Sequence, residues 1–422
     1  MKKNILHRGL IQNILEQGIT IDNYLTIEAR ADGLTASLSV NSCEYCVDGD
    51  GNWKTLAAGT ATEVINTGQT LSFRGNLTPT SSNGIGTFTI KKSCYLKGNC
   101  MSMLFGDNAA NNYSLNGKDY AFYKLFYNCT NIVKISESFL PATTLATYCY
   151  RYMFYGCTKL QTAPVLPATT LKQCCYDGMF RGCTSLTKAP TLSATTLVTG
   201  CYRSMFYGCT KLTTAPTLSA KTLGVNCYYD MFNSCTSLTT APTLPATTLK
   251  QYCYYGMFYG CTNLKTAPEL PATTLANYCY TNMFYGCTSL TSALKLPATI
   301  LINGCYSYMF RGCTNLKTAP ELPATTLANY CYQGMFQGCK NLTTAPELPA
   351  TKLEGSCYNC MFYGCTKLNY IKMLATNISA SKCLNTWVSN VASTGTFVKN
   401  SAMTSLPTGT SGIPEGWTVV DA

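Results

Sequence analysis

The stretch that decides the fold spans residues 261–286 and reads CTNLKTAPELPATTLANYCYTNMFYG. Cys287 follows this stretch, and the same pattern begins again. The opening cysteine recurs every 26 residues from Cys157 to Cys365, and Cys129 precedes this series by 28 residues. A fixed period of this length predicts a solenoid, in which each unit buries its apolar side only by stacking on its neighbours.

Apolar residues spaced by four predict a short helix in each unit. In one unit these residues are Leu145, Cys149, Met153 and Cys157, and this spacing is typical of one helical face. We therefore expect a helix near residues 145–156 and at the equivalent positions of the other units. A short strand should follow it and end at a proline, which lacks the N–H that an interior strand donates.

The unit C-T-x-L-x-x-A-P-x-L-P-A-T-T-L-x-x-x-C-Y-x-x-M-F-x-G resembles the BspA-like leucine-rich repeats of bacterial surface antigens. That group also has a Phe, a Gly and a Cys just before the strand leucine. This sequence has Cys-Tyr and Met-Phe pairs where the group more often has Ile-Gly and Ala-Phe. The resemblance covers about residues 120–370, and it implies a leucine-rich-repeat fold and adhesion to a protein or glycan.

The fold class expected is an α/β solenoid, a leucine-rich-repeat array of 26-residue units with an N-terminal β-sandwich-like domain. Its parts are an N-terminal attachment helix (1–23), an immunoglobulin-like β-domain (24–98), an N-terminal cap (99–128), the array (129–365) and a C-terminal cap (366–422). Caps are expected because the exposed ends of a solenoid need a polar cover.

The region before the array predicts a helix and then strands. Residues 4–17 are amphipathic, and their helix either packs on the next domain or anchors the chain in a larger assembly. The candidate strands are Tyr24–Ala29, Leu34–Val40, Glu44–Val47, Trp53–Leu56, Thr70–Gly75 and Gly86–Lys91. Short strands at close spacing favour an immunoglobulin-like sandwich, which serves as a spacer or an attachment module.

Most of the 26 cysteines belong to the repeat itself. Nineteen of them form two columns of the array, where the pattern predicts reduced thiols packed as small apolar residues. Outside the array, Cys43, Cys46, Cys94 and Cys100 form a group that is packed, bridged by disulfides, a redox pair or bound to zinc. Packing or a disulfide is the preferred interpretation, and no metal or cofactor is expected.

Composition argues against several functions. The chain carries a formal charge of +12, but its lysines and arginines are scattered rather than gathered in the basic stripe of a nucleic-acid-binding protein. Its single histidine, His7, excludes Ser-His-Asp and Cys-His catalysis in the array. No phosphate loop or dinucleotide fingerprint is present. We therefore expect a protein that is not an enzyme and that binds neutral hydrogen-bonding partners.

The sequence also suggests where the protein works. No Sec signal peptide is apparent, and no stretch reaches the 18 apolar residues that would predict membrane insertion. We expect a virion surface, as a phage fibre or a head- or tail-attached receptor-binding protein. The alternative is a bacterial cell-surface adhesin exported without a Sec signal. Other subunits would bind through residues 1–98, and homo-oligomer formation is left open.

Positions that differ between otherwise constant units are the candidate binding residues. Their mixture of tyrosine and arginine is typical of binding faces, and the alternative is that they are ordinary solvated residues. The candidates are Tyr152, Tyr155, Arg181, Arg203, Tyr207, Tyr229, Tyr255, Tyr259, Tyr285, Tyr308 and Arg311. Tyr150 and its equivalents are instead expected to pack between units. A third class of function, a zinc- or thiol-based redox protein, depends only on the cysteines outside the array.

Overall fold

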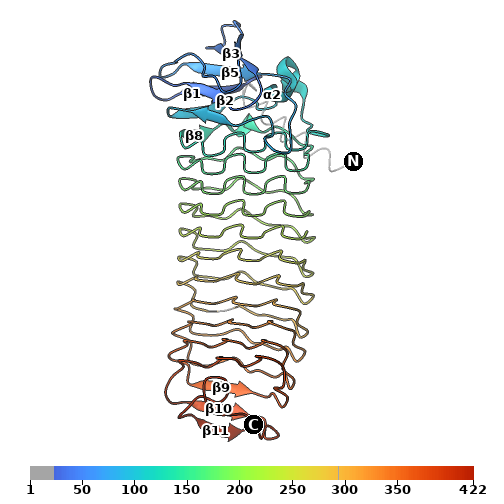
Figure 1. The fold of residues 1–422 in the computed structure, drawn as a ribbon, viewed down its shortest axis with the longest axis vertical. Coiled ribbons are helices and arrows are strands. Elements are labelled where there is room, and N and C mark those ends of the chain that lie inside the picture. The colour runs from blue at the N-terminus through green and yellow to red at the C-terminus, as the bar shows by residue number, and fades with distance from the viewer. Residues whose placement is uncertain (1–22, 293) are drawn as a thin grey trace.

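The computed structural model describes residues 23–292 and 294–422. It is a rod of coils stacked along one axis, with a β-sheet at each end (Figure 1). The solenoid predicted from the repeat is confirmed. The attachment helix predicted over residues 1–23 falls, except for its last residue, outside the described part of the chain.

The helices predicted within the array are wrong. Among the described residues of 129–365 there is no α-helix. Each coil carries a run of turns where the helix was expected. Neighbouring coils are joined by isolated parallel bridges between residues 26 apart, such as Thr162 to Lys188 and Thr196 to Thr222. The array is therefore a solenoid of turns and single bridges rather than of helices and strands.

Hydrogen bonds show why the turns replace a helix. Alternate amides bond within the coil, as from Met153 N to Tyr150 O at 3.2 Å. The amides between them bond to the next coil, as from Phe154 N to Met179 O at 2.9 Å. Within each run of turns, every fourth residue has a positive φ, including Tyr152 at 54°. Because a chain of four-residue turns also turns every fourth side chain inward, its spacing imitates that of a helix.

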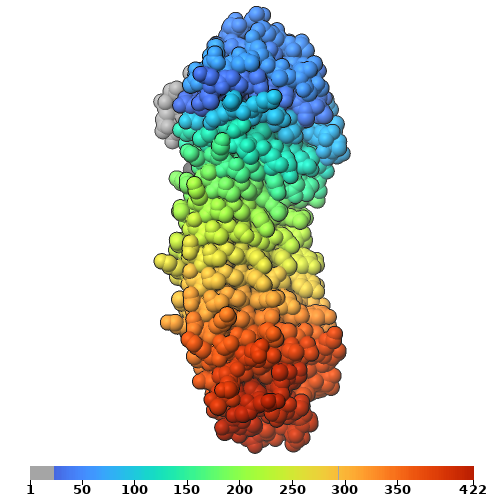
Figure 2. Space-filling model, turned by 60° about the vertical axis from the view of Figure 1, so that its left-hand side comes forward, coloured from blue at the N-terminus to red at the C-terminus, as the bar shows by residue number. Residues whose placement is uncertain are grey.

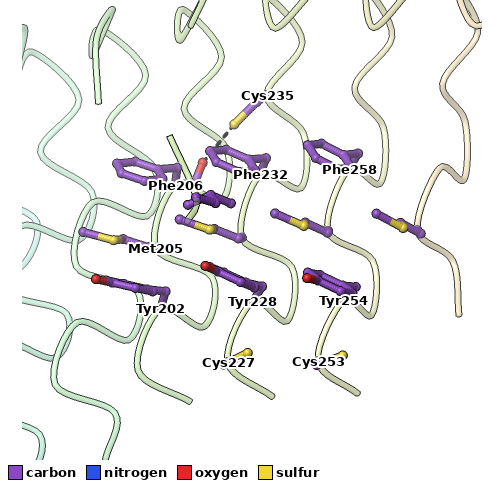
Figure 3. Close-up of a cluster of buried hydrophobic side chains, with 14 of the residues drawn as sticks. Tyr202, Met205, Phe206, Cys227, Tyr228, Phe232, Cys235, Cys253, Tyr254 and Phe258 are labelled. Carbon is purple, nitrogen blue, oxygen red and sulfur yellow. Dashed lines mark hydrogen bonds between the residues drawn. The ribbon is translucent and has the colours of Figure 1, made fainter. Parts of the chain in front are cut away.

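The core consists of columns that run the length of the array. Figure 3 shows three of them, with Tyr202, Met205 and Phe206 of one coil followed by their equivalents in the next coils. Successive rings are nearly parallel, with centroids 5.7 Å apart for Tyr228 and Tyr254. The prediction that Tyr150 and its equivalents pack between units is confirmed, since each is at most 2% exposed.

The inward orientation predicted for the cysteine columns is also confirmed. Both columns are buried, and all 26 cysteines are free thiols. In one column each thiol donates to a phenylalanine carbonyl of the preceding coil, as from Cys235 Sγ to Phe206 O at 3.1 Å. Dispersion and these weak hydrogen bonds therefore add to the backbone bonds between coils, and no disulfide links the coils in the described part of the chain.

Residues 23–98 of the described chain contain seven strands. They are β1 (Leu25–Ala29), β2 (Ala36–Leu38), β3 (Cys43–Val47), β4 (Lys54–Leu56), β5 (Thr70–Arg74), β6 (Phe88–Ile90) and β7 (Cys94–Lys97). The first six confirm the six predicted strands, whereas β7 was not predicted. The main sheet has the order β4-β3-β5-β1-β7-β8, and β2 pairs separately with β6.

This main sheet runs directly into the array. Its last strand, β8 (Ile132–Ile135), belongs to the first repeat and pairs in parallel with β7. Between them lie α2 (Ser102–Phe105) and a 3-10 turn, η1 (Gly106–Asn111), and η2 (Glu137–Phe139) follows β8. The immunoglobulin-like form of residues 24–98 stays a prediction.

The C-terminal end continues the stacking beyond Cys365. Strands β9 (Tyr370–Met373), β10 (Thr396–Lys399) and β11 (Thr418–Asp421) form a parallel sheet in the order β11-β10-β9. Trp387 is fully buried and covers the last core tyrosine, with 6.3 Å between the centroids of its ring and that of Tyr358. The indole Nε1 donates to Gly412 O at 2.9 Å, which fixes this ring at the end of the core.

Candidate functional site

One side of the rod carries the predicted binding residues, and we name it the turn face. It consists of the columns that contain Arg151, Tyr152 and Tyr155 and their equivalents in the following coils. In each coil the Met-Phe pair between these columns is buried in the core. The larger residues on either side of the pair reach the surface, whereas several smaller ones, such as Asp177, Ser204 and Ser307, are buried. Figure 2 shows the coils as successive bands along the surface of the rod.

None of the eleven predicted residues is buried. Arg203 is exposed, and the following ten are partly exposed: Tyr152, Tyr155, Arg181, Tyr207, Tyr229, Tyr255, Tyr259, Tyr285, Tyr308 and Arg311. Several of them touch across neighbouring coils. Ring centroids are 4.6 Å apart for Tyr229 and Tyr255 and 4.4 Å apart for Tyr259 and Tyr285, and both pairs are stacked.

Arginines extend these aromatic rows. The Arg181 guanidinium carbon lies 4.0 Å from the ring centroid of Tyr207, and that of Arg203 lies 5.3 Å from Tyr229. Farther along the rod, the guanidinium carbon of Arg311 is 5.2 Å from the ring centroid of Tyr285. These cation–π contacts hold long, flexible side chains in place before any ligand arrives.

One buried acid lies among these arginines. The side chain of Asp177 is 1% exposed, and its Oδ2 accepts a hydrogen bond of 2.9 Å from Arg151 Nε. Burial raises the pKa of Asp177, and the charges of Arg151 and Arg203 act in the opposite direction. Its Oδ1 has no hydrogen-bond partner among the described residues. Asp177 thus positions Arg151 from below the surface.

Sequence reasoning missed part of the turn face. A further column contains Tyr148 and its equivalents, and the Tyr252 and Tyr278 rings stack there with centroids 5.2 Å apart. This column also varies, between tyrosine, glycine, asparagine, cysteine and serine, and this variation is the signal that could have revealed it. Arg151 was likewise absent from the predicted set, although its position varies in the same way.

The four cysteines before the array do not form a cluster of their own. All four are buried free thiols. Cys94 lies near the thiols of Cys129 and Cys157, and Cys100 lies near Cys149, so these two prolong the cysteine columns. Within the described ranges, no group of three or more histidine, cysteine or acidic side chains is placed to hold a metal ion.

Two shallow grooves lie on another side of the rod, at the proline corner of the coils. One has a volume of about 430 Å³ and is lined by residues that include Pro164, Lys188 and Pro190. The other has a volume of about 380 Å³, with Pro320, Glu321, Pro346 and Glu347 in its lining. These linings repeat nearly the same residues in each coil, so they offer less chemical variety than the turn face.

No helix in the described part of the chain has the length and apolarity needed to cross a membrane.

Comparison with known families assigns the repeat. The model of the BspA-type leucine-rich repeat region matches six copies, over residues 118–239, 225–369 and 278–402. Neither the curated proteins nor the solved structures gave a match. The matched family is a non-enzymatic kind of repeat scaffold and is generally associated with surfaces and adhesion. The chain belongs to the BspA-type leucine-rich repeat family.

Proposed function

We propose that this chain is a non-enzymatic recognition protein that binds a surface protein or glycan through its turn face. The observation that carries the proposal is the contrast between the inside and the outside of the coils. The core columns repeat tyrosine, methionine, phenylalanine and cysteine almost unchanged, whereas the turn face changes from coil to coil. A rigid interior with a varied exterior is what a binding scaffold needs.

The chemistry of the turn face supports binding. Tyrosine and arginine supply large contact areas together with hydrogen-bond donors, and they are enriched at the energetic centres of interfaces. The stacks that they form here restrict their rotamers, so less side-chain entropy is lost on binding.

The thiols do not support a redox function. Burial raises the pKa of Cys43 to about 12 and that of Cys100 well above its ordinary value. The thiolate is the nucleophile and the metal ligand, so such thiols are poor reagents at neutral pH.

Attachment through residues 1–98 is part of the proposal. The N-terminal sheet lies at one end of the rod, so a partner held there would leave the array projecting outward (Figure 1). We place the protein on a virion, as a phage appendage, with a bacterial cell-surface adhesin as the alternative. Capsid or tail genes next to this one would support the first, and genes for cell-envelope proteins would support the second.

The test is binding of the labelled full-length chain to a panel of bacterial strains. Tyr229→Ser and Tyr255→Ser together should abolish binding to any strain that the unchanged chain recognises. The matched control is Tyr370→Ser, which alters a partly exposed tyrosine of β9 away from the turn face. Unchanged binding by the double variant, with loss in the control, would refute the turn face as the binding surface.

A further inference from the structure

The arginine of the second coil is enclosed by two tyrosines of its own column. The Arg181 guanidinium carbon lies 4.0 Å from the ring centroid of Tyr207 in the next coil and 5.8 Å from that of Tyr155 in the preceding coil. The two rings flank the guanidinium along the column, and such ring contacts do not use its N–H donors. Within residues 23–292 and 294–422, no hydrogen bond or ion pair uses these N–H groups.

Two further arginines flank this one on the neighbouring coils. Arg151 is fixed by its bond to Asp177 and donates from its terminal nitrogen to Tyr152 Oη at 3.2 Å. Arg203 is exposed, and its guanidinium rests on the Tyr229 ring. Arg151 and Arg203 belong to one column and Arg181 to the column four residues farther along the chain, and all three are close enough to Asp177 for their charges to lower its pKa.

The acids near these arginines cancel only part of their charge. Asp177 is buried and already bonded to Arg151, so a ligand in solvent does not reach it. Asp230, which is partly buried, is the other carboxyl close to Arg181 and Arg203, and it accepts a hydrogen bond of 3.0 Å from Asn233. The two carboxylates offset two of the three positive charges, but neither Arg181 nor Arg203 forms an ion pair among the described residues, so the surface around them attracts anions.

We propose that Arg181 and Arg203 bind the carboxylate or sulfate groups of an acidic glycan. The inference deepens the proposed function and rests on the turn face being the binding surface. A guanidinium edge matches two oxygens of a carboxylate or sulfate, and such paired charge-assisted hydrogen bonds are strong and geometrically selective.

A glycan suits the surroundings of the arginines better than an acidic peptide does. The groups next to the guanidiniums are tyrosine rings and hydroxyls, including those of Tyr152 and Tyr207. Phenol hydroxyls pair with sugar hydroxyls, whereas peptide ligands are normally anchored by side chains that fill apolar pockets.

The experiment measures the affinity of the full-length chain for four immobilised polymers. Heparin carries sulfates, polygalacturonate carries carboxylates, dextran is a neutral glycan, and polyglutamate is an acidic peptide. We expect at least one acidic glycan to bind more tightly than both dextran and polyglutamate. Equal or tighter binding of polyglutamate, or binding of neither acidic glycan, would overturn the proposal.

Two variants connect the binding to the site. Arg181→Lys keeps the positive charge but removes the paired N–H donors that can bond two oxygens of one anion. It should therefore weaken binding of the acidic glycan about tenfold. Lys221→Gln removes an exposed charge from the ladder that includes Thr222, away from the turn face, and should change affinity less than about twofold. Unchanged affinity in Arg181→Lys would refute the site, and weaker binding in Lys221→Gln at the same time would show that binding follows net charge alone.

The two proposals fail in different ways. If Tyr229→Ser and Tyr255→Ser abolish binding to bacteria while neither acidic glycan binds, the ligand is wrong and the turn face remains the binding surface. If these tyrosine substitutions leave binding to bacteria intact, the proposed function itself is wrong. The melting temperature of Arg181→Lys, compared with that of the unchanged chain, shows that lost binding does not come from unfolding.

Discussion

The Tyr152 ring lies against Gly178 of the next coil, so closely that a Cβ added to Gly178 would be 2.3 Å from the Cε1 atom of Tyr152. The same relationship joins Tyr308 with Gly334 and Tyr278 with Gly304. Glycine in the following coil thus makes room for a surface tyrosine that lies along the rod. The variation of the turn face is therefore coordinated between neighbouring coils.

Replacing Gly178 by alanine should displace the Tyr152 ring and destabilise the array. Gly178 has a φ of 58°, so the substitution adds backbone strain to the steric clash, and we expect a loss of about 1–3 kcal/mol. Thermal unfolding measures the loss. The control is Gly59→Ala, where φ is 74° but no atom lies within 4 Å of the added Cβ, so only the strain should appear. Equal losses in the two variants would contradict the contact.

Replacing Tyr254 by phenylalanine should not lower the stability of the chain, because the tyrosine hydroxyl has no hydrogen-bond partner among the described residues. This hydroxyl is buried, so removing it relieves a desolvation cost of about 1–3 kcal/mol. We expect Tyr254→Phe to be neutral or stabilising in chemical denaturation.

A satisfied buried hydroxyl provides the comparison for Tyr254. Ser102 Oγ donates to Phe73 O and accepts from Leu25 N, each at 2.8 Å, so Ser102→Ala should be destabilising. A loss of more than about 1 kcal/mol in Tyr254→Phe would mean that its hydroxyl is paired, for instance with buried water.

Alkaline pH should unfold the array because of its buried thiols. Burial raises the pKa of Cys261 from 9.0 to about 12, so the folded chain keeps a proton that the unfolded chain releases. The stability that each such thiol contributes is complete below about pH 9 and is lost as the pH rises toward 12. The loss is about 1.4 kcal/mol per pH unit for each thiol in that window.

Denaturant titrations between pH 7 and pH 11 check this pH dependence. Replacing Cys261 by alanine should reduce the slope of stability against pH above pH 9, even though the substitution itself destabilises the chain. A slope that is the same in the variant and in the unchanged chain would show that the thiol does not titrate on unfolding.

Exposure divides the cysteines into two groups for alkylation. Cys174 and Cys360 are partly exposed, whereas the other 24 are buried. Under native conditions iodoacetamide should therefore modify Cys174 and Cys360 first, and the remaining thiols should react only after unfolding. Mass spectrometry of proteolytic fragments identifies the modified sites, and early modification of Cys235 would contradict the packed column.

Much of the fold follows from the sequence because the repeat imposes it. A side chain that recurs every 26 residues must face either the core or the solvent in every coil, so the inward cysteines and the outward tyrosines were both predictable. The helix was not excluded, because Cys149, Met153 and Cys157 have the same spacing in a chain of four-residue turns. Only the bonds between coils, as from Tyr150 N to Cys175 O, distinguish the two structures.

The parts that sequence reasoning missed depend on partners distant in the chain. Strand β7 is short and pairs on one side with β8 of the first repeat, and local alternation does not reveal such a partner. The sandwich of Arg181 between Tyr155 and Tyr207 needs three successive coils to be placed in register. Each residue was identified as a candidate, but their contact became visible only in the structure.

The central claim is that ligands bind the turn face, and tyrosine iodination of the full-length chain with and without bound bacteria tests it most directly. We predict that Tyr229, Tyr255 and Tyr285 lose reactivity when bacteria are bound, while Tyr370 of β9 reacts equally in both samples. The buried Tyr254 should stay unmodified throughout. Protection of Tyr370 with unchanged reactivity of the three turn-face tyrosines would contradict the account.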